Sequence, residues 1–206
     1  MHPNPAFRQV AEARNLAFAR ERGFGTLCVG GPDVPLLAHV PFLLDTEARV
    51  VRLHLVRSNP VARALPARGV LAVTGPDGYV SPDWYGVPDQ VPTWNYVAVH
   101  LLGPVERLPE AEMRAELDAL SAAFEARLPK PPWRADKMTP ATLDRMMRQI
   151  VPCRMAVEEV RGTWKLGQNK PGPARRGAAA GVEAAGVGAQ AAALAALMRA
   201  AVTPEA

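Results

Sequence analysis

The residues best suited to bind a phosphate form a short block around residue 57. An expected strand ends in Arg57-Ser58-Asn59, a proline then starts a turn or helix, and Arg63 follows one helical turn later. A hydroxyl, an amide, two guanidinium groups and the backbone N–H groups of such a turn can converge on one phosphate. The alternative is a solvated strand end whose polar side chains bind nothing.

A second concentration is aromatic. Five of the seven Trp and Tyr residues lie between positions 79 and 96, on either side of the loop 86–92. Tyr and Trp gather where one edge of a ring must be apolar and the other polar, as at ligand pockets and interfaces. This favours contact with a planar ligand or a dimer interface over ordinary packing beneath a long hairpin loop. The five residues are Tyr79, Trp84, Tyr85, Trp94 and Tyr96.

A third polar group, Lys165, Gln168 and Asn169, follows the last expected strand. A lysine beside two amides can meet an anion or the edge of a ring, or can simply form a solvated exit loop. His39, His54 and His100 lie on separate expected strands and lack close spacing, so no metal site is predicted. No nucleophile elbow, phosphate-binding P-loop or dinucleotide glycine fingerprint is present.

Composition limits the class of protein. With 49% hydrophobic and 21% charged residues, the chain has an ordinary globular composition, which excludes wholesale disorder. Two distant cysteines, Cys28 and Cys153, argue against a disulfide framework or a zinc site. The sequence contains neither a long apolar run nor a basic segment leading into one, so we expect no membrane helix, no secretory signal and a cytoplasmic location.

The positive charge is local. Residues 1–160 hold 18 basic and 18 acidic side chains, so the net charge of +4 lies entirely in residues 161–206. A protein that reads DNA directly normally presents a wider basic surface. The charge pattern therefore does not support DNA as a partner.

The elements that must position these groups are mostly strands. Turn residues, among them Gly75-Pro76-Asp77-Gly78, separate six β-rich runs, and three helices are predicted at 9–22, 109–128 and 140–150. This pattern predicts an α+β, mainly β fold, a six-stranded antiparallel barrel with appended helices. We expect one domain over 1–170, followed by an Ala/Gly-rich segment over 171–206 that forms a short helix or a frayed tail. The runs are 24–29, 36–44, 50–56, 70–74, 96–108 and 153–164.

Taken together, these segments resemble the PaiB-type family of FMN-binding negative transcriptional regulators. The Ser-Pro-Asp-Trp-Tyr block at 81–85 and the Pro-Thr-Trp-Asn-Tyr block at 92–96 are highly specific, and the block at 57–60 is moderately so. Further matches lie at 24–27, 38–45 and 165–169, in the family's order, and the resemblance spans roughly residues 1–200. Gly167 is a departure, because the family usually has Ser there.

The resemblance implies an FMN-binding split barrel, similar to pyridoxamine phosphate oxidases and usually a homodimer with flavin at the subunit interface. It assigns the phosphate to Arg57, Ser58, Asn59 and Arg63, with His39 lining the same pocket. It further implies that the ring or ribityl chain contacts one group of residues and that a second group closes the site. These groups are Thr93, Trp94 and Asn95, and Lys165, Gln168 and Asn169.

Two functions follow from the resemblance. One is a regulator that uses bound FMN as a ligand or redox signal, and the other is a flavin-dependent oxidoreductase with an unknown substrate. The regulator lacks a recognisable helix-turn-helix, because the connector at 128–137 is too long for one. The enzyme lacks an identifiable acid or base, so the sequence leaves catalysis open.

Overall fold

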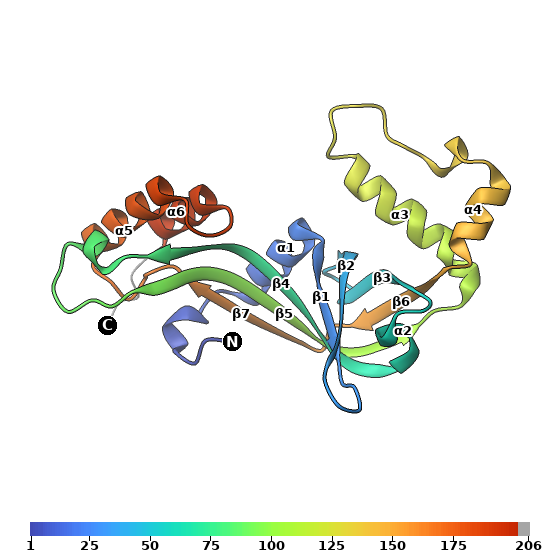
Figure 1. Cartoon of the computed structure of the whole chain (residues 1–206), viewed down its shortest axis with the longest axis horizontal. Helices are drawn as coiled ribbons and strands as arrows, with labels where there is room; N and C mark the ends of the chain where they lie inside the picture. Colours follow the sequence, from blue (N-terminus) through green and yellow to red (C-terminus); the bar gives the residue numbers. More distant parts are fainter. Residues whose placement is uncertain (202–206) are drawn as a thin grey trace. The chain divides into compact units, whose positions relative to one another are not determined.

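The expected β-runs form one antiparallel sheet that closes on itself. In the computed structural model, which describes residues 1–201, the strand order is β4-β1-β2-β3-β6-β5-β7, and β4 also pairs with β5 (Figure 1). Six strands therefore make a ring, and β7 is added beside β5. The predicted mainly β, six-stranded antiparallel barrel with appended helices is confirmed. The strands are β1 (Phe24–Val29), β2 (Leu36–Asp45), β3 (Val50–Val56), β4 (Ala67–Val80), β5 (Thr93–Arg107), β6 (Ile150–Ala156) and β7 (Glu159–Lys165).

Six α-helices and four short 3₁₀ helices accompany the sheet in the part of the chain that the structure describes. Within the described residues, none of the helices is long and apolar enough to cross a membrane. The α-helices are α1 (Glu12–Arg22), α2 (Pro60–Ala64), α3 (Met113–Glu125), α4 (Pro140–Met147), α5 (Gly172–Ala185) and α6 (Ala191–Ala200). The 3₁₀ helices are η1 (Pro5–Phe7), η2 (Pro82–Tyr85), η3 (Glu110–Glu112) and η4 (Ala135–Lys137).

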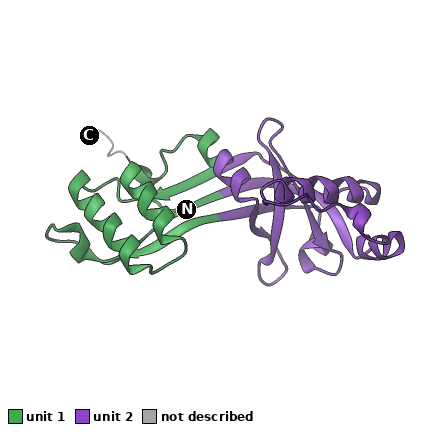
Figure 2. Cartoon of the chain, turned by 90° about the horizontal axis from the view of Figure 1, so that it is seen from above, with its two compact units in different colours: residues 1–15, 74–99, 161–206 green, residues 16–73, 100–160 purple. Residues whose placement is uncertain are grey.

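The chain divides into two compact units, coloured separately in Figure 2. Unit 1 comprises Met1–Asn15, Thr74–Val99 and the chain from Arg161 on, and unit 2 comprises Leu16–Val73 and His100–Val160. The boundary predicted after residue 170 falls inside unit 1. The segment predicted as 171–206 contains α5 and α6, and residues 202–206 lie outside the described residues.

Alternation of buried and outward residues explains why β3 forms where it does. Val51, Leu53 and Leu55 are buried, whereas the residues between them face outward. β3 pairs antiparallel with β6, and Leu53 lies opposite Cys153 in the register. One face of the strand therefore belongs to the core of unit 2, and the other face carries Arg52 and His54.

The expected turn at Gly75-Pro76-Asp77-Gly78 is wrong, because these residues continue β4. The Asp77 N–H donates to the Ala189 carbonyl at 3.0 Å, and the Tyr79 N–H donates to the Val187 carbonyl at 3.1 Å. The extended backbone is therefore hydrogen-bonded to the segment between α5 and α6. A Cβ at Gly78 would lie 3.0 Å from Leu194 Cδ2. This glycine therefore permits close packing by α6 instead of forming a turn.

The expected strand over 153–164 is also wrong as a single run, because it is two strands, β6 and β7. The chain turns between them, where the Val157 N–H donates to Arg49 O at 2.8 Å and the Glu158 N–H donates to Leu102 O at 2.9 Å. These bonds connect residues distant in sequence, so the local pattern did not reveal the break. The predicted helices are shorter than expected, because each leaves its terminal residues to 3₁₀ helix, loop or strand.

The Gly and Ala residues of α5 serve packing in unit 1. α5 packs against α6 and η2. A Cβ at Gly181 would lie 2.2 Å from Trp84 Cδ2, and one at Gly177 would lie 2.6 Å from the Trp84 carbonyl oxygen. The helix therefore lies directly on the Trp84 residue, and any side chain at these two positions would collide with it.

We expect the Gly181→Ala substitution to lower the free energy of unfolding by about 1–3 kcal/mol, because overpacking of the Trp84 ring outweighs the gain in helix propensity. Gly172→Ala in the same helix is the control, since its Cβ would meet only the flexible end of Arg176, at 3.2 Å. Urea denaturation of both variants measures the difference. Equal unfolding midpoints would contradict the packing described here.

Candidate functional site

The turn between β3 and α2 carries the predicted phosphate ligands of unit 2. Asn59 caps α2, because its side-chain oxygen accepts a hydrogen bond from the Val61 N–H at 2.8 Å. Ser58 and Arg63 are exposed, and within residues 1–201 their side chains have no hydrogen-bond or ion-pair partner. The turn therefore presents one free hydroxyl and one free guanidinium group on a backbone fixed by the cap.

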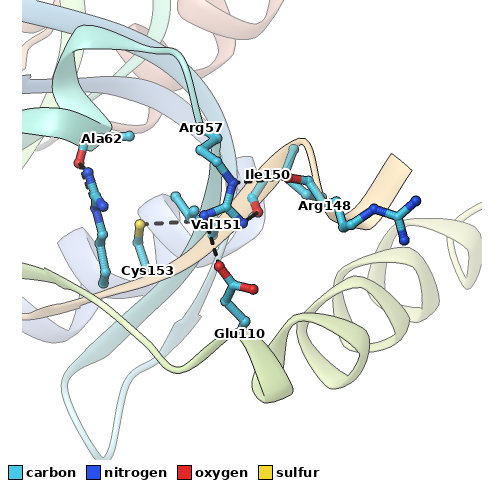
Figure 3. A network of polar contacts seen from close by, with 8 residues as sticks. Arg57, Ala62, Glu110, Arg148, Ile150, Val151 and Cys153 are labelled. Carbon is cyan, nitrogen blue, oxygen red and sulfur yellow. Dashed lines mark hydrogen bonds and ion pairs between the residues drawn. The ribbon is translucent and has the colours of Figure 1, made fainter. Parts of the chain in front are cut away.

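Arg57 lies in the same turn and already has protein partners (Figure 3). Its Nε donates to Arg148 O at 3.0 Å and its Nη2 donates to Ile150 O at 3.3 Å. Its Nη1 makes an ion pair with Glu110 Oε1 at 2.8 Å. Arg57 thus ties the end of β3 to the start of β6 and to η3, and Glu110 balances its charge.

The structure places His39 on β2 in the same unit. Its Nδ1 and the Thr26 hydroxyl are 2.9 Å apart, and the two residues lie opposite each other in the β1–β2 register. The imidazole is exposed, and within the described residues its hydrogen bond goes to Thr26 alone. The structure does not link it to the Arg57 turn by a direct bond.

The remaining candidates lie in unit 1, where two lysines form a cluster. Lys165 donates to the Thr93 hydroxyl, and its ammonium lies 6.0 Å from the centre of the Phe7 ring. Lys170 donates to Gln90 Oε1 and lies 5.4 Å from the centre of the Tyr85 ring. Partial burial lowers the pKa of Lys165, and the charge of Lys170 lowers it further. The repulsion between the two ammonium groups would be relieved by an anion bound beside them.

Gln168 holds the loop that carries this cluster. Its side-chain nitrogen donates to Trp164 O at 2.7 Å and to Ala6 O at 3.1 Å, and its oxygen accepts from the Leu166 N–H at 2.8 Å. The side chain is buried, so its amide is fully occupied inside the protein. The structure therefore shows Gln168 acting on the position of its neighbour Lys165, whereas the exposed Asn169 is open to solvent.

Asn95 and Trp94 alternate across β5 in unit 1. Asn95 is buried and donates to the Met198 sulfur at 3.6 Å, while Trp94 is 47% exposed. The Trp94 ring meets Tyr79 edge to face at 6.5 Å, and Tyr79 meets Trp84 in the same way at 6.2 Å. An aromatic surface with one open face therefore lies on the strand that also carries Thr93.

Gly167, the departure from the family pattern, has a structural reason. Its φ is +76°, a conformation that favours glycine, and Arg175 Cγ lies 3.5 Å from the position of an added Cβ. The loop therefore takes a shape here that a serine would adopt only with strain.

Sequence reasoning missed three residues that complete the unit 1 site. Lys170 and Gln90 pair with each other, 80 positions apart, and a separation of that size leaves no local signal. Arg175 is 6% exposed, and its Nε donates to Met198 O at 3.1 Å. Its Nη1 also donates to Lys170 O at 3.4 Å, which anchors the lysine cluster to α5.

Comparisons with known proteins decide the family. A family model described as "Putative FMN-binding domain" matches residues 1–159. The "Protease synthase and sporulation protein PAI 2" of Bacillus subtilis (strain 168) is 31% identical over 172 residues, which cover 81% of this chain and 82% of that protein. The chain belongs to this FMN-binding-domain family. The predicted resemblance to the PaiB-type family is thereby confirmed.

More distant relatives of this FMN-binding-domain family member extend the comparison. An uncharacterized protein of Emericella nidulans is 23% identical over 217 residues, which cover 85% of this chain and 86% of the relative. Among solved structures, the flavocytochrome Anf3 from Azotobacter vinelandii aligns at a TM-score of 0.57 and 16% identity, over 80% of this chain and 72% of that one. The FAD and heme binding protein from Mycobacterium smegmatis aligns at a TM-score of 0.55 and 17% identity, over 77% of this chain and 73% of that one. These two structures share the fold, a flavin-type split barrel.

The family match covers the sites unevenly. Residues 1–159 include the Arg57 turn, His39 and the Thr93–Asn95 stretch. Lys165, Gln168 and Asn169 lie beyond the matched range. Within residues 1–201, no three His, Cys, Asp or Glu side chains gather into a group that could hold a metal ion.

Cys153 lies close to the Arg57 network in this FMN-binding-domain family member (Figure 3). It is fully buried, and its thiol donates to Val151 O at 3.7 Å. Burial raises the pKa of the Cys153 thiol to about 11, although the charge of Arg107 acts in the opposite direction. The reactive thiolate therefore appears only as the pH approaches 11.

We expect a disulfide reagent such as 5,5′-dithiobis(2-nitrobenzoate) at pH 8 to modify one thiol, that of the part-exposed Cys28, and to leave Cys153 unmodified. A thiol with a pKa near 11 is about one part in a thousand thiolate at pH 8, so its reaction should be about a hundredfold slower or more. The coloured thiolate that the reagent releases is measured with the Cys28→Ser variant, once native and once denatured. In this variant Cys153 is the remaining cysteine, so its reaction is measured separately from that of Cys28. Rapid reaction of the native variant would show that Cys153 is accessible.

Proposed function

We propose that the protein binds FMN and uses the bound flavin as the ligand or redox signal of a negative regulator. The observation that carries the proposal is the family match over residues 1–159, which covers the Arg57 turn and the aromatic blocks. When bound, FMN supplies an isoalloxazine ring that accepts and returns electrons. The named Bacillus subtilis relative is a protease synthase and sporulation protein, which supports a regulatory role.

The unit 2 turn fits the phosphate end of FMN. Ser58 and Arg63 are exposed and have donors without partners in the described chain, and they would hold the phosphate. Asn59 would fix the turn through its cap, and Arg57 would set the strand end and add positive charge from its place beside Glu110. Charge-assisted bonds from a guanidinium are the strong contacts available to a phosphate.

The unit 1 residues fit the ring and ribityl chain. Trp94 offers an exposed aromatic face, and Thr93 offers a hydroxyl that Lys165 orients. The lysine cluster would favour a negative charge on the bound molecule. We propose that the site is completed in a homodimer, where His39, Lys165 and Asn169 would close it from one subunit or the other, with Gln168 positioning Lys165.

We expect Arg63→Ala to weaken FMN binding at least tenfold, because one charge-assisted phosphate contact is worth roughly 1.5–3 kcal/mol. Arg57→Ala should weaken binding too and should also lower the melting temperature, since it breaks the bonds to Arg148 and Ile150. Fluorescence titration with FMN, beside thermal unfolding, measures both effects.

Two controls accompany this titration. Riboflavin lacks the phosphate, so its affinity should be low in the parent and unchanged in Arg63→Ala. Arg68→Ala removes another exposed arginine of unit 2, which pairs with Glu158, and should leave FMN binding intact. An unchanged FMN affinity in Arg63→Ala would mean that the phosphate binds elsewhere.

The structure reduces the charge available for direct DNA contact. Arg175 lies in the basic stretch 161–206, but it is buried and donates to backbone carbonyls. Lys165 and Lys170 face protein groups in the cluster. Arg161, Arg176 and Arg199 remain exposed, with Arg199 paired to Glu183, and three such side chains offer few phosphate contacts and no base readout. We therefore propose that regulation acts through flavin chemistry or a protein partner.

We expect no sequence-specific DNA binding by the FMN-loaded protein near physiological salt. Fluorescence anisotropy with promoter fragments from the source genome and with random duplex should give equally weak binding, because the few exposed cations act on any phosphate backbone alike. Nanomolar binding to one fragment, a thousandfold tighter than to random DNA, would instead establish a direct repressor.

A further inference from the structure

A cavity of about 360 Å³ lies in unit 2, apart from the residues assigned to FMN. Residues of β3, β6, α3, α4 and η4 line it, together with the connector between the two helices. It lies against the outward face of β3, where His54 projects between buried neighbours. Ligand pockets in proteins span roughly 300–1,000 Å³, so this cavity is large enough for a small molecule.

The lining is mostly apolar and easily deformed. Methionine side chains are flexible and polarisable, so they adapt to aromatic ligands and make favourable sulfur–ring contacts. Trp133 adds a flat aromatic wall. The main apolar lining residues are Leu117, Trp133, Met138, Leu143, Met146 and Met147.

His54 supplies a hydrogen-bonding group to this cavity. Within the described residues its imidazole has no hydrogen-bond partner. Burial lowers the pKa of His54, so the ring is neutral near pH 7 and carries one donor nitrogen and one acceptor nitrogen. A ligand hydroxyl or carbonyl can therefore bond to it.

The charges around the cavity cancel. Arg114 and Asp118 both line it, and they pair with each other at 2.7 Å on successive turns of α3. These two residues, with Ser121 and Trp133, also line an adjoining hollow of about 420 Å³, to which Arg134 and Asp136 add one charge of each sign. No uncompensated charge among these lining groups would draw in a phosphate or a carboxylate.

We propose that this cavity binds a neutral aromatic molecule of two or three fused rings, with one hydroxyl or carbonyl hydrogen-bonded to His54. The volume suits such a molecule and is too small for a helix of a partner protein, whose diameter with side chains is about 10–12 Å. The site is distinct from that of FMN, because its lining offers no unpaired cation for the phosphate. The proposal does not depend on what the bound flavin does.

The test is equilibrium dialysis of 2-naphthol against the full chain, first without FMN and then with FMN in excess. We expect saturable binding of one 2-naphthol per chain. Met146→Trp should weaken this binding at least tenfold, because Met146 is 52% exposed at the cavity and the larger ring fills it without disturbing the core. Leu128→Trp is the matched control, since Leu128 is 47% exposed in the same unit and does not line the cavity.

A second variant tests the polar contact. His54→Phe should weaken 2-naphthol binding roughly three- to tenfold, the usual effect of one hydrogen bond. It should leave the binding of naphthalene, which has no hydroxyl, unchanged. Circular dichroism of each variant confirms that it is folded.

Four results would overturn the proposal. The first is the absence of saturable 2-naphthol binding, and the second is an equal loss of 2-naphthol affinity in Leu128→Trp and Met146→Trp. The third is an equal change in the affinities for 2-naphthol and naphthalene in His54→Phe. The fourth is displacement of 2-naphthol by FMN. The last would assign the cavity to the flavin. A parallel FMN titration in the absence of 2-naphthol keeps a failure of flavin binding distinguishable from a failure here.

Discussion

The pairing of β4 with β5 is the constraint on which the rest of the structure depends, because it closes six strands into a ring. An open sheet of these strands would leave two rows of unpaired N–H and C=O groups. Closure also places alternate residues of every strand in one interior, where side chains from distant parts of the sequence fill the core of unit 2. The largest of these fully buried side chains are Phe42, Leu27, Leu53, Leu71, Leu101 and Met155.

A closed ring holds its loops at defined places, and polar side chains then fix the loops themselves. Arg57 joins the end of β3 to β6, Asn59 caps α2, and Gln168 bonds the loop after β7 to the N-terminal segment. A buried amide such as that of Gln168 is costly to leave unpaired, so each bond restricts the loop to one conformation. The polar segments of this chain therefore contain two kinds of residue, those that bond to the backbone of a loop and those that remain exposed.

The same division applies to the charged side chains of unit 2. Several arginines of unit 2 are paired with acidic side chains, as in Arg52 with Glu112 and Arg68 with Glu158. Arg63, in contrast, is exposed and has no ion-pair partner among the described residues, so its guanidinium is available to an anion. The cavity lined by α3 and α4 differs from the Arg57 turn, because its charged residues pair with each other and its methionines favour a neutral ligand.

The sequence by itself determined the fold class and the bounds of β1 and β3, and it located the polar and aromatic blocks. Alternation along 50–56 and the turn residues around it are local signals, and the structure places β3 at those same bounds. The blocks around Arg57 and Trp94 could likewise be recognised from the sequence, because a motif is defined by the order of its residues alone. Their roles as ligands remain predictions.

Only the tertiary structure decided which of these side chains are free. Whether Arg57 faces a ligand or Glu110, and whether Arg175 lies on the surface or beneath Met198, depends on residues tens of positions away. The segment Gly75–Gly78 also depends on distant residues. Its residue types predict a turn, but it is extended because residues 187–189 supply its hydrogen-bond partners. Hydrogen bonding and burial are set by contacts across the fold, and a local pattern of residue types does not contain them.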